Sequence, residues 1–401
     1  MNHRVLLTGL ALLIFTATEI RSAQALCPGC DAPSTTLTEQ VELSAHLLLG
    51  KYKTGSKPTA ETAGTSTFEI ISVAKSRGDL FEAGQSIELP QYIAGKSDGL
   101  YILMGPDDKL IDWHIPAEAS EDSWQYVSNL PPSTTDPQEQ TKRLAYFLKY
   151  LEHPEVTVAN DAYAEFAIAP YDVITPLKDQ LPREKLREWV VDPETPVTRL
   201  GLYGILLGQC GNEEDEQAMK ETILHPQSEF RLGIEGVMWG YMILGGEEAL
   251  QVLEDAKLKA RTYVNKDGEE VKLPFSETYA VMQALRFMWS HEPDRIPKER
   301  LKQSMRILLG RPELADLVIA DLARWKDWGV QDQLMAMYDD EEFNIPSVKR
   351  AIIRYMYYCS EDVPEEAETP PDYAVTAAKH LATLEQKDPK TYRSAKRFLV
   401  R

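Results

Sequence analysis

Cysteine is scarce in this chain, with 4 in 401 residues, which is too few for a fold built on disulfides. Cys210 and Cys359 lie inside apolar segments of helical period, where a free thiol packs as a small hydrophobic side chain. Cys27 and Cys30 differ, because only two residues separate them. Their spacing favours a local disulfide or structural pin, with thiol redox chemistry, metal binding or an unpaired state as alternatives. No histidine follows Cys30, so covalent haem attachment is not indicated.

Basic residues are few relative to acidic ones: 43 Lys and Arg against 63 Asp and Glu give a formal net charge of -20. Such a surface repels phosphate backbones and anionic lipid, which argues against nucleic acid and membrane surfaces as partners. The basic stretch from Lys387 to Arg401 is the exception, and we interpret it as the solvated face of a terminal helix. With 43% hydrophobic residues, the composition is typical of a folded chain with roughly two or three compact units.

The apolar run at the N-terminus, residues 5–17, is shorter than the roughly 20 residues that span a membrane. It follows Arg4 and precedes the small-residue motif Ala23-Gln24-Ala25. This order predicts a signal peptide, residues 1–25, cleaved after Ala25. Because Leu26 is not small, we expect no lipid anchor on the following cysteine. The sequence therefore predicts a secreted or periplasmic protein whose mature chain does not insert into a membrane.

Catalytic motifs are lacking as well. Gly95-Lys96-Ser97-Asp98-Gly99 matches the nucleophile motif G-x-S-x-G, but that motif leads into a helix, whereas here an expected strand follows. His291-Glu292 is not continued by a second histidine four residues on, so a zinc-protease helix is not indicated. Asp339-Asp340-Glu341-Glu342 lacks the ligand spacing of a calcium-binding EF-hand loop. We therefore predict no catalytic residue, no metal site and no cofactor, and we expect that the protein is not an enzyme.

The N-terminal part is predicted to form strands, because runs of β-branched and apolar residues alternate with turn residues. The five expected strands are residues 46–52, 67–73, 85–89, 100–104 and 110–115. They suggest a small barrel, which a helix at about residues 118–129 would close. Residues 26–130 are thus predicted to form a small β-rich domain, and the proline-rich residues 131–137 are predicted to be a linker.

After Pro137 the spacing of apolar residues changes from two to 3.6, which predicts helices almost without interruption. Segments with helically spaced small residues recur at steps of roughly 39, 32, 47, 37 and 33 residues, close to the period of HEAT repeats. The longest step contains a predicted β-hairpin at residues 262–273, around an Asp-Gly turn. We therefore expect residues 138–401 to form an α-solenoid, a stack of paired helices.

The segment Phe343–Tyr355, with its proline and its Val348-Lys349-Arg350-Ala351, resembles the second-helix signature of HEAT repeats. The resemblance extends loosely over residues from about 140 to 400, and armadillo-like or other α-α superhelices share its features. It implies a right-handed HEAT-type α-α superhelix with an extended binding surface.

The N-terminal part resembles a netrin-like module, the OB-type barrel of tissue inhibitors of metalloproteinases. The order of Cys27-x-x-Cys30, Ala45–Gly50, Phe68–Lys75, Gly84–Ile87 and Gly99–Gly105 follows that family. The resemblance implies an OB-like β-barrel and, as an alternative function, an inhibitor-like or ligand-binding module. The domain has no third cysteine with which to pair the first two, as that family does. Those inhibitors bind zinc through an N-terminal cysteine, whereas Leu26 would precede Cys27, so we expect no zinc-directed inhibition.

Trp325 and Trp328, with Arg324 beside them, lie where one expected helix gives way to the next. We take the three as interaction candidates, because tryptophan and arginine dominate the energetics of protein interfaces. The alternative is that the tryptophans fill the wedge between repeats. The sequence as a whole predicts a multidomain α and β protein: an exported, non-enzymatic interaction or scaffold protein that binds another protein through its solenoid.

Overall fold

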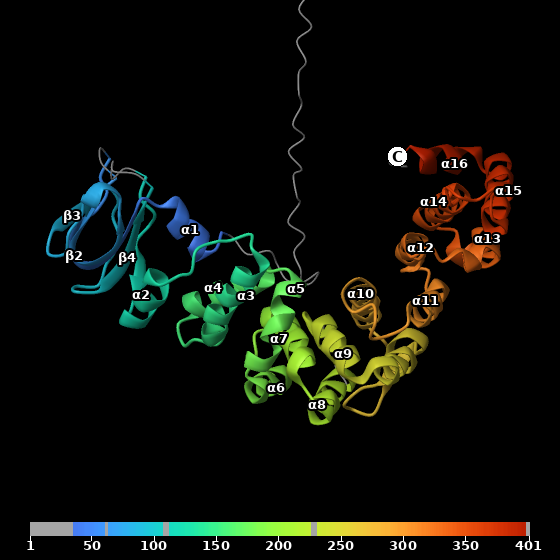
Figure 1. Cartoon of the computed structure of the whole chain (residues 1–401), viewed down its shortest axis with the longest axis horizontal. Coiled ribbons are helices and arrows are strands. Elements are labelled where there is room, and N and C mark those ends of the chain that lie inside the picture. Colours follow the sequence, from blue (N-terminus) through green and yellow to red (C-terminus); the bar gives the residue numbers. More distant parts are fainter. Residues whose placement is uncertain (1–34, 61–62, 107–111, 226–230, 398–401) are drawn as a thin grey trace, which may run out of the picture.

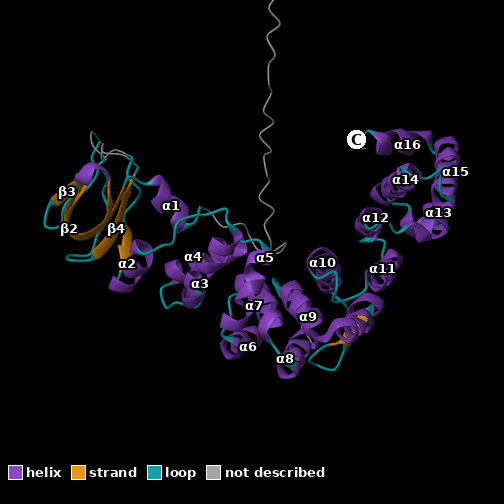
Figure 2. Ribbon diagram, in the orientation of Figure 1, coloured by secondary structure: helices purple, strands orange, loops and turns teal. Residues whose placement is uncertain are grey.

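The computed structural model describes residues 35–60, 63–106, 112–225 and 231–397. Within these ranges, sixteen α-helices accompany a five-stranded antiparallel sheet on the N-terminal side and a two-stranded hairpin (Figure 1, Figure 2). The predicted combination of α and β structure is thereby confirmed. The predicted signal peptide, residues 1–25, and the pair Cys27 and Cys30 lie outside the described residues.

The five strands of the sheet pair in the order β3-β2-β1-β4-β5, each antiparallel to its neighbours. Their bounds are β1 (His46–Ser56), β2 (Thr65–Ser76), β3 (Ser86–Leu89), β4 (Leu100–Gly105) and β5 (Ala117–Ala119). In the described part of the chain the edge strands β3 and β5 do not pair with each other. The sheet is therefore open, and the closed barrel expected from the sequence is not formed.

The fifth strand does not lie where the sequence predicted it, at residues 110–115. Described residues 112–115 form no ladder, and the three-residue strand β5 follows instead. The Trp113 side chain is only 5% exposed and packs into the core on one face of the sheet. His114 donates a single backbone hydrogen bond to the Met104 carbonyl, at 2.9 Å, and Pro116 has no N–H to extend the pairing. Burial of one tryptophan thus draws the chain out of the ladder.

Strand β1 gives the sheet two apolar faces, because successive side chains point to opposite sides. Leu48 packs with Phe68 and Leu103 in a core that belongs to the sheet alone. Leu47 and Leu49 face the other way and join the main core of the helices. The β module and the helical part therefore share buried apolar surface.

Two short helices, α1 (Leu37–Leu43) and α2 (Glu121–Ser128), lie beside the sheet (Figure 1). Helix α1 was not predicted from the sequence, although Thr36 and Glu39 form the reciprocal bonds of a capping box at its start. Helix α2 falls within the predicted helix at 118–129. The predicted linker is shorter than expected, because Asp136 caps the next helix and Pro137 is its first residue.

The remaining helices form an arc, with α7, α9, α10, α12 and α14 on its concave side and α6, α8, α11, α13 and α15 outside (Figure 1). Their bounds are α3 (Pro137–Phe147), α4 (Val156–Ala167), α5 (Tyr171–Ile174), α6 (Arg183–Val191), α7 (Val197–Cys210), α8 (Glu213–Leu224), α9 (Ile234–Leu253), α10 (Phe275–His291), α11 (Lys298–Ile307), α12 (Ala315–Arg324), α13 (Gln331–Asp339), α14 (Pro346–Glu361), α15 (Asp372–Lys387) and α16 (Pro389–Lys396). The hairpin β6 (Thr262–Val264) and β7 (Glu270–Lys272) separates α9 from α10, as predicted. None of the helices in the described ranges is long and apolar enough to cross a membrane.

Two cysteines belong to described helices, and both are free: Cys210 in α7 and Cys359 in α14. Burial raises the pKa of Cys210 to about 11 and that of Cys359 to about 12. Both thiols therefore stay protonated at neutral pH and serve as packing side chains, as the sequence predicted.

Candidate binding groove between α12 and α14

Helix α12 has one apolar side and one side of small and charged residues. Val318 and Leu322 are fully buried in the main core. Ala320, Ala323 and Arg324 lie on another side, which borders a groove. The apolar side fixes the helix on the core, and the other side is left open along the groove.

Helix α14 is the next helix on the concave side of the arc (Figure 1). Ile352 and Met356 are buried in the main core. Arg350, Arg354 and Tyr358 follow one another at intervals of four residues, so they share one face of the helix. All three line the groove.

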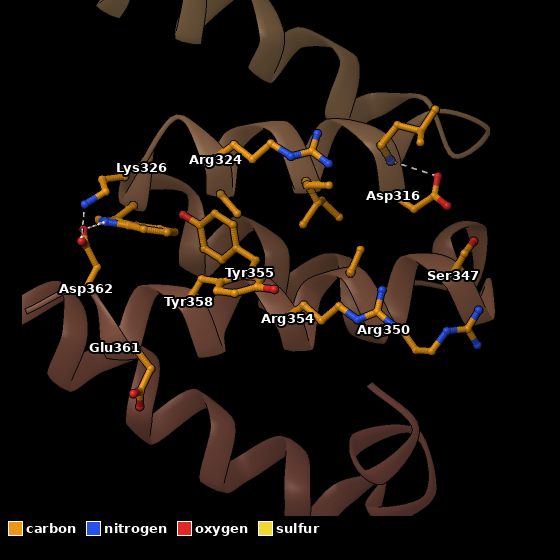
Figure 3. Close-up of a pocket in the computed structure, with 16 residues that line it drawn as sticks. Asp316, Arg324, Lys326, Ser347, Arg350, Arg354, Tyr355, Tyr358, Glu361 and Asp362 are labelled. Atoms are coloured by element: carbon orange, nitrogen blue, oxygen red, sulfur yellow. Dashed lines mark hydrogen bonds and ion pairs between the residues drawn. The ribbon is translucent and has the colours of Figure 1, made fainter. Parts of the chain in front are cut away.

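The groove between the two helices has a volume of about 670 Å³ (Figure 3). Ala320, Ala323 and Ala351 are among its lining residues, and their small side chains leave space between the helices. The complete lining is Asp316, Leu317, Ile319, Ala320, Ala323, Arg324, Lys326, Trp328, Ser347, Arg350, Ala351, Arg354, Tyr355, Tyr358, Glu361 and Asp362.

The charge of the groove differs from that of the chain. Four of its lining residues are Lys or Arg and three are Asp or Glu, a formal charge of +1 in a chain of -20. Figure 3 shows the guanidinium groups of Arg324, Arg350 and Arg354 on the side toward Asp316 and Ser347. Lys326 and Asp362 lie at the opposite end.

Asp362 binds two residues that follow α12, at one end of the groove. Its Oδ1 lies 2.5 Å from the Lys326 Nζ, and the Trp328 indole N–H donates to its Oδ2 at 2.7 Å. Partial burial opposes ionisation of this carboxyl, but the bonds from Lys326 and Trp328 outweigh it and lower the pKa of Asp362. Lys326 itself has a φ of +51°, in the left-handed region that residues other than glycine rarely adopt. The ion pair therefore secures a sharp turn of the chain.

Buried polar contacts tie the helices around the groove together. The Asp321 carboxylate, 2% exposed, accepts hydrogen bonds from Arg286 of α10 at 2.7 Å and from Arg324 at 2.9 Å. The buried Tyr355 hydroxyl of α14 donates to the backbone carbonyl of Asp327, and burial raises the pKa of this tyrosine. Because these groups are satisfied internally, hydrogen bonds within the chain hold the walls of the groove in place.

The interaction candidates chosen from the sequence occupy two kinds of position. Arg324, whose side chain is 71% exposed, and the half-buried Trp328 both line the groove. Trp325 is only 6% exposed and stacks on Trp289 of α10, with ring centroids 4.4 Å apart. Trp325 therefore packs between helices and presents no surface to the groove.

Comparison with known proteins adds nothing to this geometry. No family model, curated protein or solved structure matches this chain. Within the described residues, no group of three or more His, Cys, Asp or Glu side chains could hold a metal ion. The lining of the groove combines guanidinium groups, the aromatic rings of Trp328, Tyr355 and Tyr358, and small apolar side chains around an open space.

Arg350, Arg354 and Tyr358 were not predicted as candidate binding residues from the sequence. The signal was present, because a spacing of four residues places all three on one helix face. The segment that contains the two arginines was considered only for its resemblance to a repeat. The missing information was the position of α12, which forms the other wall.

Proposed function

We propose that this protein is an exported, non-enzymatic scaffold that binds a segment of another protein in the groove between α12 and α14. The observation that carries the proposal is the groove itself: about 670 Å³ on the concave side of a helical arc, with a charge opposite to that of the chain. Its size falls within the ~300–1,000 Å³ of ligand pockets. The N-terminal pattern of residues 1–25 supports export.

We also propose that the helical part is a right-handed HEAT-type α-α superhelix. The alternation of helices between a concave row and an outer row supports this, as does Pro346 in the first turn of α14. For the N-terminal part we propose a netrin-like module of OB type whose sheet stays open, supported by the pairing of β1 with both β2 and β4.

A groove-filling variant tests the proposed function. Ala351→Trp places a large side chain among the small residues of the groove, at a half-buried position that borders the main core. Tagged wild-type protein and the variant are each used to capture partners from an extracytoplasmic fraction. We expect the wild type to capture a partner and Ala351→Trp to capture at least tenfold less of it, because the new side chain occupies the space that the partner needs.

The matched control is Ala382→Trp, the same substitution at an exposed position of the outer helix α15. This variant should capture the partner as well as the wild type does. Circular dichroism and thermal melting establish that both variants are folded. Equal capture by the wild type and a folded Ala351→Trp would refute binding in the groove.

A further inference from the structure

The three arginines of the groove differ in the hydrogen bonds that their guanidinium groups make within the chain. Arg324 Nη1 donates to buried Asp321, and Arg354 Nε donates to the Ala395 carbonyl of α16 at 3.3 Å. Arg350 has neither a hydrogen bond nor an ion pair to any residue that the structure describes. A guanidinium carries five N–H donors, so Arg350 offers donors that no described residue uses.

The groove also presents apolar surface on both walls. Leu317 of α12 is 38% exposed and Tyr358 of α14 is 40% exposed. Ala320 and Ala351 lie among the lining residues with them. Aromatic and aliphatic side chains beside arginines form the kind of surface on which interface hot spots occur.

We propose that the occupant of the groove is an acidic segment of a partner protein that carries apolar side chains between its carboxylates. This inference rests on the proposed function and specifies the chemistry of the partner. The carboxylates bind Arg324 and Arg350 through charge-assisted hydrogen bonds, for which the guanidinium fork is suited. The apolar side chains pack against Leu317 and Tyr358.

The overall charge of the chain favours a short acidic segment over a long polyanion. Fields at the protein surface are screened within about 8 Å at physiological salt, so a segment confined to the groove responds to the local cations. A nucleic acid would extend beyond the groove along a surface of net charge -20 and be repelled there. A second copy of the chain also carries a net charge of -20, so two copies would repel each other.

The test uses the full chain and a fluorescent peptide of alternating glutamate and leucine, with a glutamine-leucine peptide as the uncharged probe. Wild-type protein should bind the glutamate peptide at least tenfold more tightly, with an affinity that falls as salt concentration rises. Arg350→Glu should weaken binding at least tenfold, because it replaces an attractive charge by a repulsive one. Tyr358→Ala should weaken binding of both peptides.

The matched control is Arg393→Glu, the same charge change at an exposed arginine of α16 outside the groove. It should change the affinity by less than about twofold. Equal binding of the two peptides, or equal effects of folded Arg350→Glu and Arg393→Glu, would overturn the inference. Displacement of the glutamate peptide by duplex DNA, or a dimer that Arg350→Glu dissociates, would identify a different occupant and overturn it as well.

The outcome separates this inference from the proposed function. If a captured partner is lost with Ala351→Trp but retained in full by Arg350→Glu, the groove binds a protein without acidic recognition, and only the inference fails. If Ala351→Trp retains the partner, the proposed function fails first.

Discussion

Asp161 in α4 connects three elements at the junction between the β module and the helices. Its Oδ1 accepts a hydrogen bond from the Leu37 backbone N–H of α1 at 2.7 Å, and its Oδ2 accepts one from the Tyr126 hydroxyl of α2 at 2.6 Å. The residue is 7% exposed. Burial, opposed by these two bonds, raises the pKa of Asp161 to about 6. The junction therefore contains a carboxyl that titrates under mildly acidic conditions.

This pKa predicts a pH dependence of stability with a definite sign. Because folding raises the pKa, the contribution of Asp161 to stability is fully present below the ordinary value of 3.8 and is lost as pH rises through about 6. A shift of about two units corresponds to about 3 kcal/mol. The asparagine of Asp161→Asn cannot ionise. Between about pH 4 and about pH 7, the free energy of unfolding of this variant should therefore rise by up to about 3 kcal/mol relative to that of the wild type.

Urea unfolding at several pH values measures this difference. Asp179→Asn, at an exposed position, is the control and should leave the profile of the wild type unchanged. If the profiles of Asp161→Asn and the wild type run parallel, Asp161 does not titrate with the raised pKa.

Helices α7 and α9 approach each other closely, through glycines on both. A Cβ on Gly236 would lie 2.2 Å from the Gly201 carbonyl oxygen, and one on Gly240 would lie 2.1 Å from the Gly204 carbonyl oxygen. Both obstacles are backbone atoms, which cannot move aside without shifting a helix. The glycines thus set the distance between the two helices.

We therefore expect Gly236→Ala to destabilise the protein by about 3 kcal/mol, at the upper end of overpacking substitutions. Gly310→Ala is the matched control, because a Cβ there meets only the Arg261 guanidinium, at 3.7 Å. The control should change the free energy of unfolding by less than about 0.5 kcal/mol. Chemical denaturation compares the two, and equal stabilities would contradict the close contact between α7 and α9.

Elements defined by local patterns were predictable, whereas their pairing was not. Strands β1 to β4 and the β6–β7 hairpin follow from alternating residues and turn signals within a few positions. The prediction of a strand at 110–115 was wrong because the burial of Trp113 is a tertiary effect that local sequence does not specify. The groove could not be predicted, because it depends on α12 and α14 packing side by side. No local spacing specifies which helix faces another.

At the scale of the whole molecule, one apolar core runs from the sheet to the last described helix. It includes Leu47 and Met104 of the sheet, Tyr126 of α2 and Phe147 of α3, and it extends to Ala395 of α16. The predicted boundary at residues 131–137 therefore crosses a region where the two parts share buried surface. The separation into two domains stays a prediction that cutting the chain can test.

We expect a fragment of residues 136–401, which keeps the Asp136 cap, to retain its helical circular dichroism and a cooperative melt. Its melting temperature should be lower than that of the intact chain, because α3 and α4 lose their cover from α1 and α2. The fragment of residues 26–130 exposes Leu47 and Leu49 and should be the less stable piece. A 26–130 fragment that melts at the temperature of the intact chain would contradict the shared core.

The central claim is that the groove between α12 and α14 binds a partner protein. Its most direct measurement is the dissociation constant of the captured partner, by calorimetry, for the wild type, Ala351→Trp and Ala382→Trp. We expect Ala351→Trp to raise the dissociation constant at least tenfold and Ala382→Trp to leave it within about twofold of the wild-type value. Equal constants for all three folded proteins would contradict it.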